Sequence, residues 1–486
     1  MKKLLALLLA VVMVLGMVAC AAKTETPAPA AETPKAEEKK EEAPKAEEKP
    51  VEEAAPAAEA PKAVVQVDYY CNIGAYLITL QKEIDKWNEG EGKEKGVYLN
   101  LISNINTYSQ DLEAFLTAGT YYDLMDASTQ TWIERGWIKN LREIGAEYPE
   151  FQAMIDSYEP YINGAHEKIG CLCGLPLEVV PIKMAVNLDL FKKNNLELPK
   201  TWEDIYNCAK TITENGNGEE FGYGWSTWSA VYRRLTFKAC MASTEKGWWD
   251  PNSATYSFSQ YEIPMNYLKA MYTEGLMLGA DDLAIDPIRA EFAAGRVGMF
   301  PAPAYDYAVY TEQFPAECEW TVIDMPAITA GADQYKGVYL DRVGAGVCKP
   351  AWDAADQAKK DAIVECLLFL NSDYLNGAIY EMGGMIPYKP EVIANAKVNA
   401  DIGPQWPIFA DLTNYVGMFQ YPDSAVILEG DNYATVCDAY VHGLLGDDWA
   451  PVAADLEERY NTAYAELKAS GDTDVSSYEA PYDHSK

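Results

Sequence analysis

The residues best equipped for chemistry in this chain are aromatic and acidic. Among its 486 residues, 33 Tyr and 12 Trp together outnumber the 39 Lys and Arg. Only three histidines occur (His166, His442 and His484), which leaves little material for zinc sites or histidine general bases. The sequence contains no G-x-S-x-G, H-E-x-x-H or Walker motif. This composition favours non-covalent binding over covalent catalysis.

Aromatic rings combined with carboxylates suit a hydroxyl-rich ligand. A sugar ring has apolar C–H faces that a flat aromatic ring covers, while carboxylates and amides take its hydroxyl hydrogen bonds. Each single Tyr or Trp is also explained by packing in a core, so a structural role stays open for every one of them. The many Asp and Glu leave a second chemistry open, which is glycoside hydrolysis by two carboxylates.

The charge balance restricts the partners. Acidic residues number 74 against 39 basic ones, and the formal net charge is -35. Such a chain repels nucleic acids and anionic lipid headgroups at long range, so no nucleic-acid partner is expected.

The N-terminus has the pattern of a lipoprotein signal. Lys2 and Lys3 precede an apolar run from Leu4 to Val18, which is short for spanning a bilayer and typical of a signal peptide. The run ends in small residues before Cys20, as in the lipobox of bacterial lipoproteins. We therefore expect a signal peptide over 1–19, a lipid on Cys20, and a disordered Ala/Pro/Glu/Lys tether over 20–63.

The cysteines form no obvious disulfide framework. Apart from Cys20 they number nine and lie mostly in apolar surroundings, so buried free thiols are expected. Cys171 and Cys173 are too closely spaced, without a second pair nearby, to favour a metal site. No metal or cofactor is predicted.

The body from residue 64 onward alternates strand and helix patterns. Strands are expected at 64–70, 98–102, 123–127 and 182–187, and helices at 75–87, 110–118, 132–137 and 188–194. This alternation is typical of an α/β fold with a mostly parallel sheet, in which ligands bind beyond the carboxyl ends of the strands. Thr201 and Asp204 predict a capping box at the start of a helix.

The second half is rich in helix. Apolar periodicity predicts helices over 262–274, 286–294, 351–372, 373–382, 435–445 and 451–470.

Three segments resemble one protein family. Gly174-Leu-Pro, followed by the segments 184–191 and 198–204, is similar to the "GLP…YN-DLF…PKTW-E" stretch of extracellular solute-binding proteins. The segment 291–300 resembles the family's helix-to-strand junction, and Gly383-Gly-Met-Ile-Pro resembles its "GG-IP" segment. The chain thus resembles the sugar-type binding proteins of ABC importers, the family that includes maltose-binding protein.

This resemblance implies a periplasmic-binding-protein-like α/β fold of two lobes around a ligand cleft. The motifs place the first lobe at 64–178 plus 345–385 and the second at 183–340 plus 388–470, with a C-terminal tail at 471–486. Hinge crossings are expected near Leu177–Pro181, Val338–Gly346 and Met385–Lys389.

The resemblance also implies the site residues, which combine aromatic rings with carboxylates, amides and a cation at the lobe edges. Those of the first lobe and first crossing are Tyr70, Asn72, Tyr76, Asp126, Thr129 and Glu178. Those of the second lobe are Trp225, Trp228, Tyr232, Arg233, Tyr305 and Asp306. Asp341 and Arg342 are expected at a hinge, paired with each other.

The function implied is that of a monomeric binding protein on the outer face of the cell membrane. It would capture a carbohydrate by hinge closure and present it to the permease subunits of an ABC importer, without enzymatic activity. A peptide or another small organic solute is the alternative ligand, and a secreted glycoside hydrolase is the alternative from another class.

Overall fold

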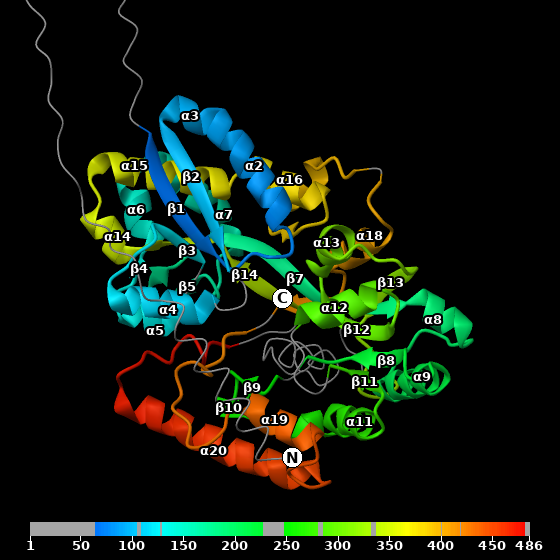
Figure 1. Cartoon of the computed structure of the whole chain (residues 1–486). Helices are drawn as coiled ribbons and strands as arrows, with labels where there is room; N and C mark the ends of the chain where they lie inside the picture. Colours follow the sequence, from blue (N-terminus) through cyan, green and yellow to red (C-terminus); the bar gives the residue numbers. More distant parts are fainter. Residues whose placement is uncertain are drawn as a thin grey trace, which may run out of the picture. The chain divides into compact units, whose positions relative to one another are not determined.

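A computed structural model describes residues 64–104, 108–126, 129–226, 247–279, 285–331, 337–399, 401–417 and 419–481. The signal sequence, the tether and Cys20 lie outside these residues. The described chain folds into two α/β lobes, each built on one main sheet (Figure 1).

The first lobe is built on a five-stranded sheet in the order β2-β1-β3-β15-β4. Its strands are β1 Val65–Cys71, β2 Val97–Ser103, β3 Leu124–Asp126, β4 Ile138–Lys139 and β15 Ala345–Cys348. β1 is parallel to β2 and β3, whereas β15 is antiparallel to β3 and β4. A segment from late in the sequence therefore completes a sheet that begins at residue 65.

Helices surround this sheet. They are α2 Leu77–Glu89, α3 Glu91–Lys95, α4 Tyr108–Ala118, α5 Gln130–Glu134, α6 Leu141–Glu147, α7 Pro149–Tyr158, α14 Lys349–Ala354, α15 Gln357–Leu370 and α16 Asp373–Glu381, with the 3-10 helix η1 Glu159–Tyr161. α2 illustrates the cause, because Leu80, Ile84 and Trp87 recur on one face of the helix and are buried. A small hairpin of β5 Glu167–Lys168 and β6 Cys171–Leu172 completes the lobe.

The second sheet follows the path β11-β8-β12-β7-β14-β17, with β13 and β16 also paired to β7. Its strands are β7 Pro176–Asn187, β8 Phe221–Gly224, β11 Met277–Leu278, β12 Val297–Pro303, β13 Trp320–Asp324, β14 Gly337–Val343, β16 Ile386–Pro387 and β17 Tyr415–Gly417. β7 is antiparallel to all four of its partners. The expectation of a mostly parallel sheet is therefore wrong for this lobe, because the long β7 runs against its neighbours.

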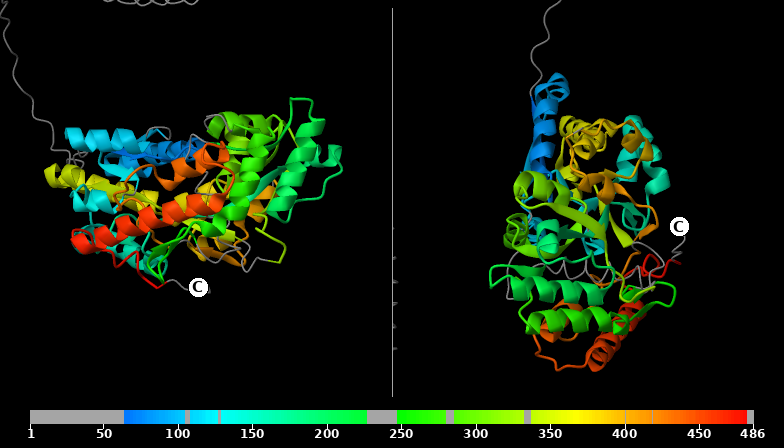
Figure 2. Two further views of the ribbon diagram at one scale, coloured as in Figure 1. Left: turned by 90° about the horizontal axis from the view of Figure 1, so that it is seen from below. Right: turned by 90° about the vertical axis from the view of Figure 1, so that its right-hand side faces the viewer.

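The helices of the second lobe include the longest in the described chain. They are α8 Leu188–Lys193, α9 Trp202–Asn215, α11 Glu262–Thr273, α12 Ile285–Ala293, α13 Asp306–Ala308, α17 Pro390–Asn395, α18 Gln405–Ala410, α19 Tyr433–Val441 and α20 Trp449–Ser470, with the 3-10 helix η2 Ser259–Tyr261 and the π-helix η3 Val309–Gln313. A hairpin of β9 Trp249–Asp250 and β10 Thr255–Tyr256 lies beside them. α11, α19 and α20 pack together (Figure 2).

Two local signals of the sequence explain helix boundaries. The Thr201 side chain accepts from the Asp204 N–H and the Asp204 side chain accepts from the Thr201 N–H, which confirms the predicted capping box of α9. The single helix expected over 351–372 is instead two, α14 and α15. The Asp356 side chain caps the second by accepting from the Lys359 N–H, so the chain restarts there.

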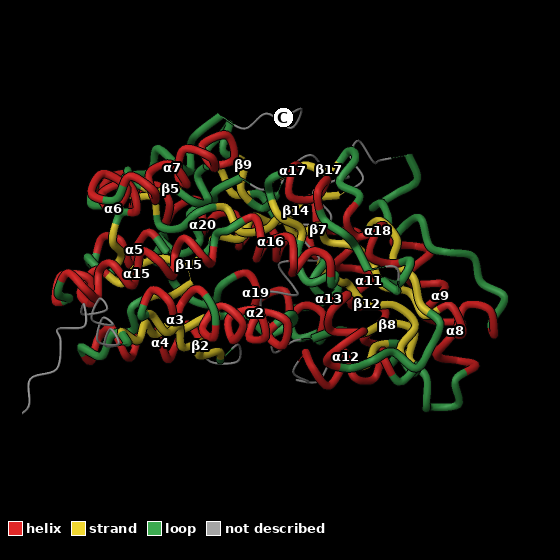
Figure 3. Tube along the Cα trace, turned by 90° about the horizontal axis from the view of Figure 1, so that it is seen from above, coloured by secondary structure: helices red, strands yellow, loops and turns green. Residues whose placement is uncertain are grey.

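The chain crosses between the two lobes on strands that lie side by side. Figure 3 shows β7 and β14 next to each other near the middle of the molecule. Membership of the two main hydrophobic cores changes between Leu175 and Val179, between Val338 and Ala345, and between Met385 and Ile386, besides isolated exchanges at Ala308 and Tyr380. The three expected crossings fall at the same places, while the lobe boundaries themselves stay a prediction.

Part of the segment 471–486, which the sequence predicts as a C-terminal tail, packs against the core of the second lobe in the residues described as far as 481. α20 ends at Gly471, which has the left-handed backbone that ends many helices. The segment that follows carries Tyr478, which is buried in the same core as α20.

Candidate binding cleft between the lobes

A cavity of about 710 Å³ lies where the lobes meet. Its first-lobe wall comprises Asn72, Tyr108, Glu113, Asp126, Thr129, Gln130, Thr131, Trp132, Ala165 and Lys168. The facing wall comprises Leu340, Asp341, Arg342 and Val343 of β14, with Phe419, Gln420, Tyr421, Ser424 and Tyr478.

The polar edge of the first lobe comes from the carboxyl ends of parallel strands. Asn72 directly follows β1, Asp126 is the last residue of β3, and Thr129 precedes α5. All three line the cavity, as the rule for ligand sites in such sheets predicts. Whether they touch a ligand stays a prediction.

Asp126 is held as a fixed hydrogen-bond acceptor. One carboxylate oxygen accepts from the Asn72 N–H at 2.5 Å and the other accepts from the Tyr69 hydroxyl. Only 8% of the residue is exposed, and burial raises the pKa of its carboxyl group. Its remaining lone pairs can therefore accept from a ligand hydroxyl without any rearrangement of the wall.

Arg342 is the cation at the junction of the lobes. Its Nη1 donates to Oε1 of Glu178 at 2.8 Å, and the Tyr76 hydroxyl donates to the same oxygen at 3.2 Å. Burial opposes the charge of Arg342, but the neighbouring Tyr76 and Glu178 raise its pKa above the ordinary value. Arg342 also reaches the first lobe, where Nη2 donates to the Asn72 carbonyl at 3.4 Å.

Glu178 and Tyr76 support Arg342 from behind the cavity wall. Both are buried, and neither lines the cavity. Burial raises the pKa of Glu178 and of Tyr76. Tyr76 was expected on the first lobe and Glu178 by the first crossing, both as ligand contacts; the structure gives both of them hydrogen bonds within a cluster around Arg342 and no surface in the cavity.

The expected pairing of Asp341 with Arg342 is wrong. Asp341 accepts from the Tyr388 hydroxyl and from Nδ2 of Asn163 at 3.2 Å, whereas Arg342 pairs with Glu178. The physical reason is that successive residues of a strand point to opposite faces, so neighbours in sequence find different partners.

Lys168 is the second cation of the wall. Its ammonium group donates to the carbonyl of Ala165 in the same hairpin region. Burial lowers its pKa, which means that its surroundings disfavour the charge. The acidic Glu113, Asp126 and Asp341 share the lining with it.

The aromatic rings of the cavity were missed by sequence reasoning. They are Tyr108 and Trp132 on the first lobe and Phe419, Tyr421 and Tyr478 on the second. Phe419 and Tyr421 lie two residues apart in a loop after β17, and this spacing in an irregular, Pro-containing stretch was the available signal. Nothing in the sequence marks Tyr478, which is distant along the chain.

Several predicted aromatic residues pack inside the lobes and do not line the cavity. Tyr70 lies between the rings of Tyr108 and Tyr122, at centroid distances of 5.0 and 4.8 Å. Trp225 is 2% exposed and stacks on Tyr223 in the second core. Tyr305 packs against both main cores.

Asp306 is likewise buried, where it pairs with Nη2 of Arg289 at 2.5 Å. The packing role that was left open for the aromatic residues therefore fits these positions better. The remaining predicted residues, Trp228, Tyr232 and Arg233, lie outside the described residues.

The described residues offer no cluster of three or more His, Cys, Asp or Glu that could hold a metal ion. Eight cysteines fall within the described ranges, and all are free thiols, with only Cys318 partly exposed. In the same ranges, no helix combines the length and the apolar character that a bilayer crossing needs.

Comparisons with known proteins agree with this architecture. Residues 76–360 match the family described as "Bacterial extracellular solute-binding protein". The sn-glycerol-3-phosphate-binding periplasmic protein UgpB of Escherichia coli K12 is 23% identical over 198 residues, which cover 38% of this chain and 44% of that relative. The chain thus matches less than half the length of this curated relative.

Among solved structures, the ABC substrate-binding protein Lmo0181 of Listeria monocytogenes, in complex with cycloalternan, has a TM-score of 0.63 at 15% identity, covering 82% of this chain and 99% of that one. The Thermotoga lettingae solute-binding protein bound with α-D-tagatose has a TM-score of 0.64 at 18% identity, covering 83% and 100%. The GacH receptor of Streptomyces glaucescens has a TM-score of 0.66 at 14% identity, covering 83% and 100%. These likenesses establish the two-lobed fold. Since the family match spans more than half of the sequence, the chain belongs to the bacterial extracellular solute-binding proteins.

Proposed function

We propose that this protein captures an uncharged carbohydrate in the cleft between its lobes and delivers it to the permease of an ABC importer. The observation that carries the proposal is the composition of the cavity. Both walls offer aromatic rings, and the fixed acceptor Asp126 and the amide side chains of Asn72 and Gln420 stand beside them. Rings and hydroxyl partners together match the two surfaces of a sugar.

The charges of the cavity favour a neutral ligand. Arg342 is committed to Glu178, and the surroundings of Lys168 disfavour its ammonium charge. Three carboxylates, those of Glu113, Asp126 and Asp341, line the same space. An anion such as a phosphate ester would meet these three carboxylates, while one of the two cations of the wall is paired with Glu178 and the other is disfavoured by burial, which makes an anion a poorer match.

The relatives give two ligand classes to compare. Solved structures with the same fold were obtained with cycloalternan, tagatose and acarbose, whereas the curated relative is named for sn-glycerol 3-phosphate. The wall chemistry above supports the first class for this chain.

The proposal includes a cellular location and a binding mechanism. The lipobox before Cys20 supports an anchor on the outer face of the cell membrane, and the acidic, Pro-rich tether supports a body held away from it. A ligand that touches both lobes favours the closed arrangement, which the permease would recognise. The protein would act as a monomer and without turnover.

Isothermal titration calorimetry on the purified chain, without its signal sequence, tests this function. The panel holds mono- and oligosaccharides, sn-glycerol 3-phosphate and short peptides. We expect heat with at least one neutral sugar and a higher melting temperature in its presence. Binding of only the phosphate ester or a peptide would contradict the carbohydrate assignment. Product analysis after incubation with oligosaccharides covers the remaining alternative, since turnover would identify a hydrolase.

A further inference from the structure

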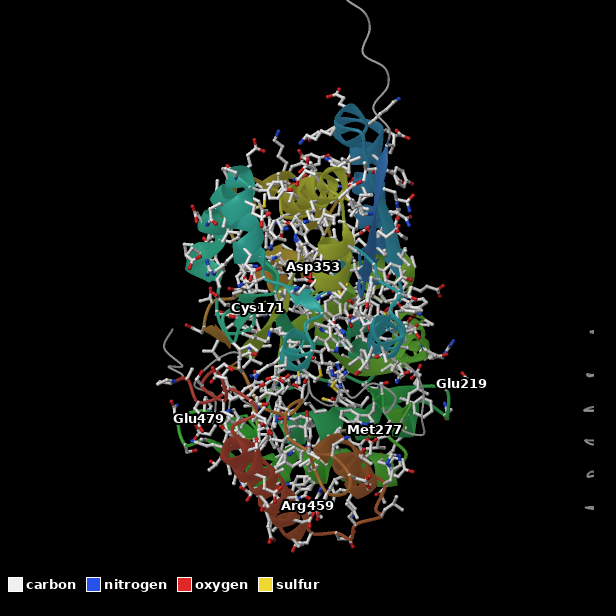
Figure 4. All side chains as sticks on the ribbon, turned by 90° about the vertical axis from the view of Figure 1, so that its left-hand side faces the viewer. Cys171, Glu219, Met277, Asp353, Arg459 and Glu479 are labelled. Atoms are coloured by element: carbon white, nitrogen blue, oxygen red, sulfur yellow. The ribbon has the colours of Figure 1, made fainter. Side chains whose placement is uncertain are left out.

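The segment that follows α20 is fixed to the second lobe by three side chains. Nε1 of Trp249 donates to the Tyr478 carbonyl at 2.9 Å. The Tyr464 hydroxyl donates to Oε1 of Glu479 at 2.8 Å, and Nζ of Lys468 donates to the same oxygen at 2.6 Å. In Figure 4, Glu479 lies at a height between Arg459 of α20 and Cys171 of the first lobe.

From this anchored position the segment reaches the first lobe. The Tyr478 hydroxyl donates to Oε1 of Gln130 at 3.0 Å, and Nε2 of Gln130 donates to the Asp474 carbonyl at 3.4 Å. Gln130 begins α5, on the opposite wall of the cleft. One amide side chain thus bonds two points of the C-terminal segment across the junction of the lobes.

Both partners are buried at this contact. Gln130 is 3% exposed and Tyr478 is 4% exposed, although both line the cavity. Burial, with the nearby Glu134 and Asp423, raises the pKa of Tyr478 to about 12, so its hydroxyl keeps its proton at neutral pH. Moving the lobes apart must break this bond and return both polar groups to water.

We propose that the segment 474–479 is a latch that holds the lobes closed through the bond between Tyr478 and Gln130. The ring of Tyr478 forms part of the cavity wall, so the latch also retains whatever ligand the cavity encloses. This second effect rests on the proposed function, whereas the effect on closure does not. A buried neutral hydrogen bond of this kind shifts an equilibrium by about fivefold.

The test measures the distance between the lobes directly. Spin labels are placed on encoded unnatural residues at Ile78 of the first lobe and Leu444 of the second, both well exposed. Double electron–electron resonance measures the distribution of distances between the two labels, in the protein alone and with the ligand of the panel that binds most tightly. The distribution gives the ratio of closed to open forms. Y478F keeps the ring and removes only the hydroxyl, and we expect it to lower the closed-to-open ratio about fivefold.

Y464F is the matched control. It removes a tyrosine hydroxyl bond from the same segment, but one that stays within the second lobe. We expect this variant to leave the ratio close to that of the wild type. Q130L removes the bond to Tyr478 and also the bond to the Asp474 carbonyl, so it should lower the ratio at least as far as Y478F. Adding Y478F to Q130L should change the ratio little further, because the bond that Y478F removes is already absent.

The outcomes separate the two proposals. An unchanged ratio in Y478F, an equal loss in Y464F, or lobes that stay open under every condition would each overturn the latch. If no sugar binds but Y478F still opens the lobes, the latch stands and the carbohydrate function fails. If a sugar binds and the latch holds, release of that sugar should be about fivefold faster from Y478F.

Discussion

Arg342 and Glu178 face each other across the antiparallel pair of β14 and β7, with Nη1 and Oε1 2.8 Å apart. Both strands pass between the lobes at this point, and Glu178 is completely buried. The ion pair therefore ties together the two crossing strands directly beside the cleft.

Replacing Arg342 tests the value of this pair. R342A leaves the Glu178 carboxylate buried without its cation, so we expect the free energy of unfolding to fall by about 3 kcal/mol. Urea denaturation followed by circular dichroism measures the loss. R296A removes an arginine whose pair with Glu291 is partly exposed, and it should cost less than about 1 kcal/mol. Equal losses in the two variants would contradict a special role for the pair at the crossing.

His166 should make stability depend on pH. It is fully buried, and burial, with a smaller effect of Lys168, lowers its pKa from 6.5 to about 3. The folded state then binds fewer protons than the unfolded state. The stability that His166 contributes is present above pH 6.5 and is lost as the pH falls toward 3. Between pH 6.5 and 5 the loss amounts to about 2 kcal/mol.

Comparison with H166F isolates this contribution. The difference in unfolding free energy between wild type and variant should change by about 2 kcal/mol between pH 6.5 and 5, because only the wild type has this group to titrate. A difference that stays constant with pH would contradict the lowered pKa of His166. An NMR signal of His166 that titrates near 6.5 in the folded protein would contradict it too.

Tyr421 should contribute to ligand affinity. Its ring lines the cavity and packs edge-on against Trp248 at 4.9 Å between centroids. For the sugar of the panel that binds most tightly, we expect Y421A to raise the dissociation constant about tenfold, as measured by calorimetry. Y374A removes a tyrosine that is 61% exposed on α16 and does not line the cavity, and it should leave the affinity unchanged. Similar losses of affinity in both variants would contradict a role of the aromatic cavity lining in ligand binding.

Substitution of glycine by alanine should have opposite effects on stability at two positions. At Gly222 an added Cβ would lie 2.1 Å from the Ala209 Cα, because β8 and α9 touch there through their backbones. G222A should therefore lower the unfolding free energy by about 3 kcal/mol. Within α16, a Cβ on Gly377 meets only Val392 at 3.7 Å, so G377A should gain about 0.5 to 1 kcal/mol. Thermal unfolding of both variants checks the signs.

The sequence predicted those features that depend on local patterns. The strand expected over 64–70 is found as Val65–Cys71, the capping box of Thr201 is present, and Asn72 and Asp126 lie at the carboxyl ends of their strands, as periodicity and short motifs predict. The family resemblance supplied the two-lobed arrangement, which no local pattern contains.

The rings of the site could not be predicted in this way. A ring in a core and a ring in a cleft have the same sequence signature, so Tyr70 and Trp225 were chosen although both are packed inside a lobe. Tyr478 and Gln130 are 348 positions apart, and only the tertiary structure brings them together. The partners of Asp341 and Arg342 were misjudged for a related reason, since the face of a strand decides which neighbour each side chain meets.

The place of β15 between β3 and β4 has a consequence for how the protein is made. β4 pairs only with β15 among the described strands, and β15 begins at Ala345. During synthesis the N-terminal sheet must therefore wait, with β3 lacking its antiparallel neighbour, until roughly 200 further residues have left the ribosome. A fragment that stops before Ala345 would carry an open sheet edge and aggregate, so the N-terminal part is not a useful expression unit by itself.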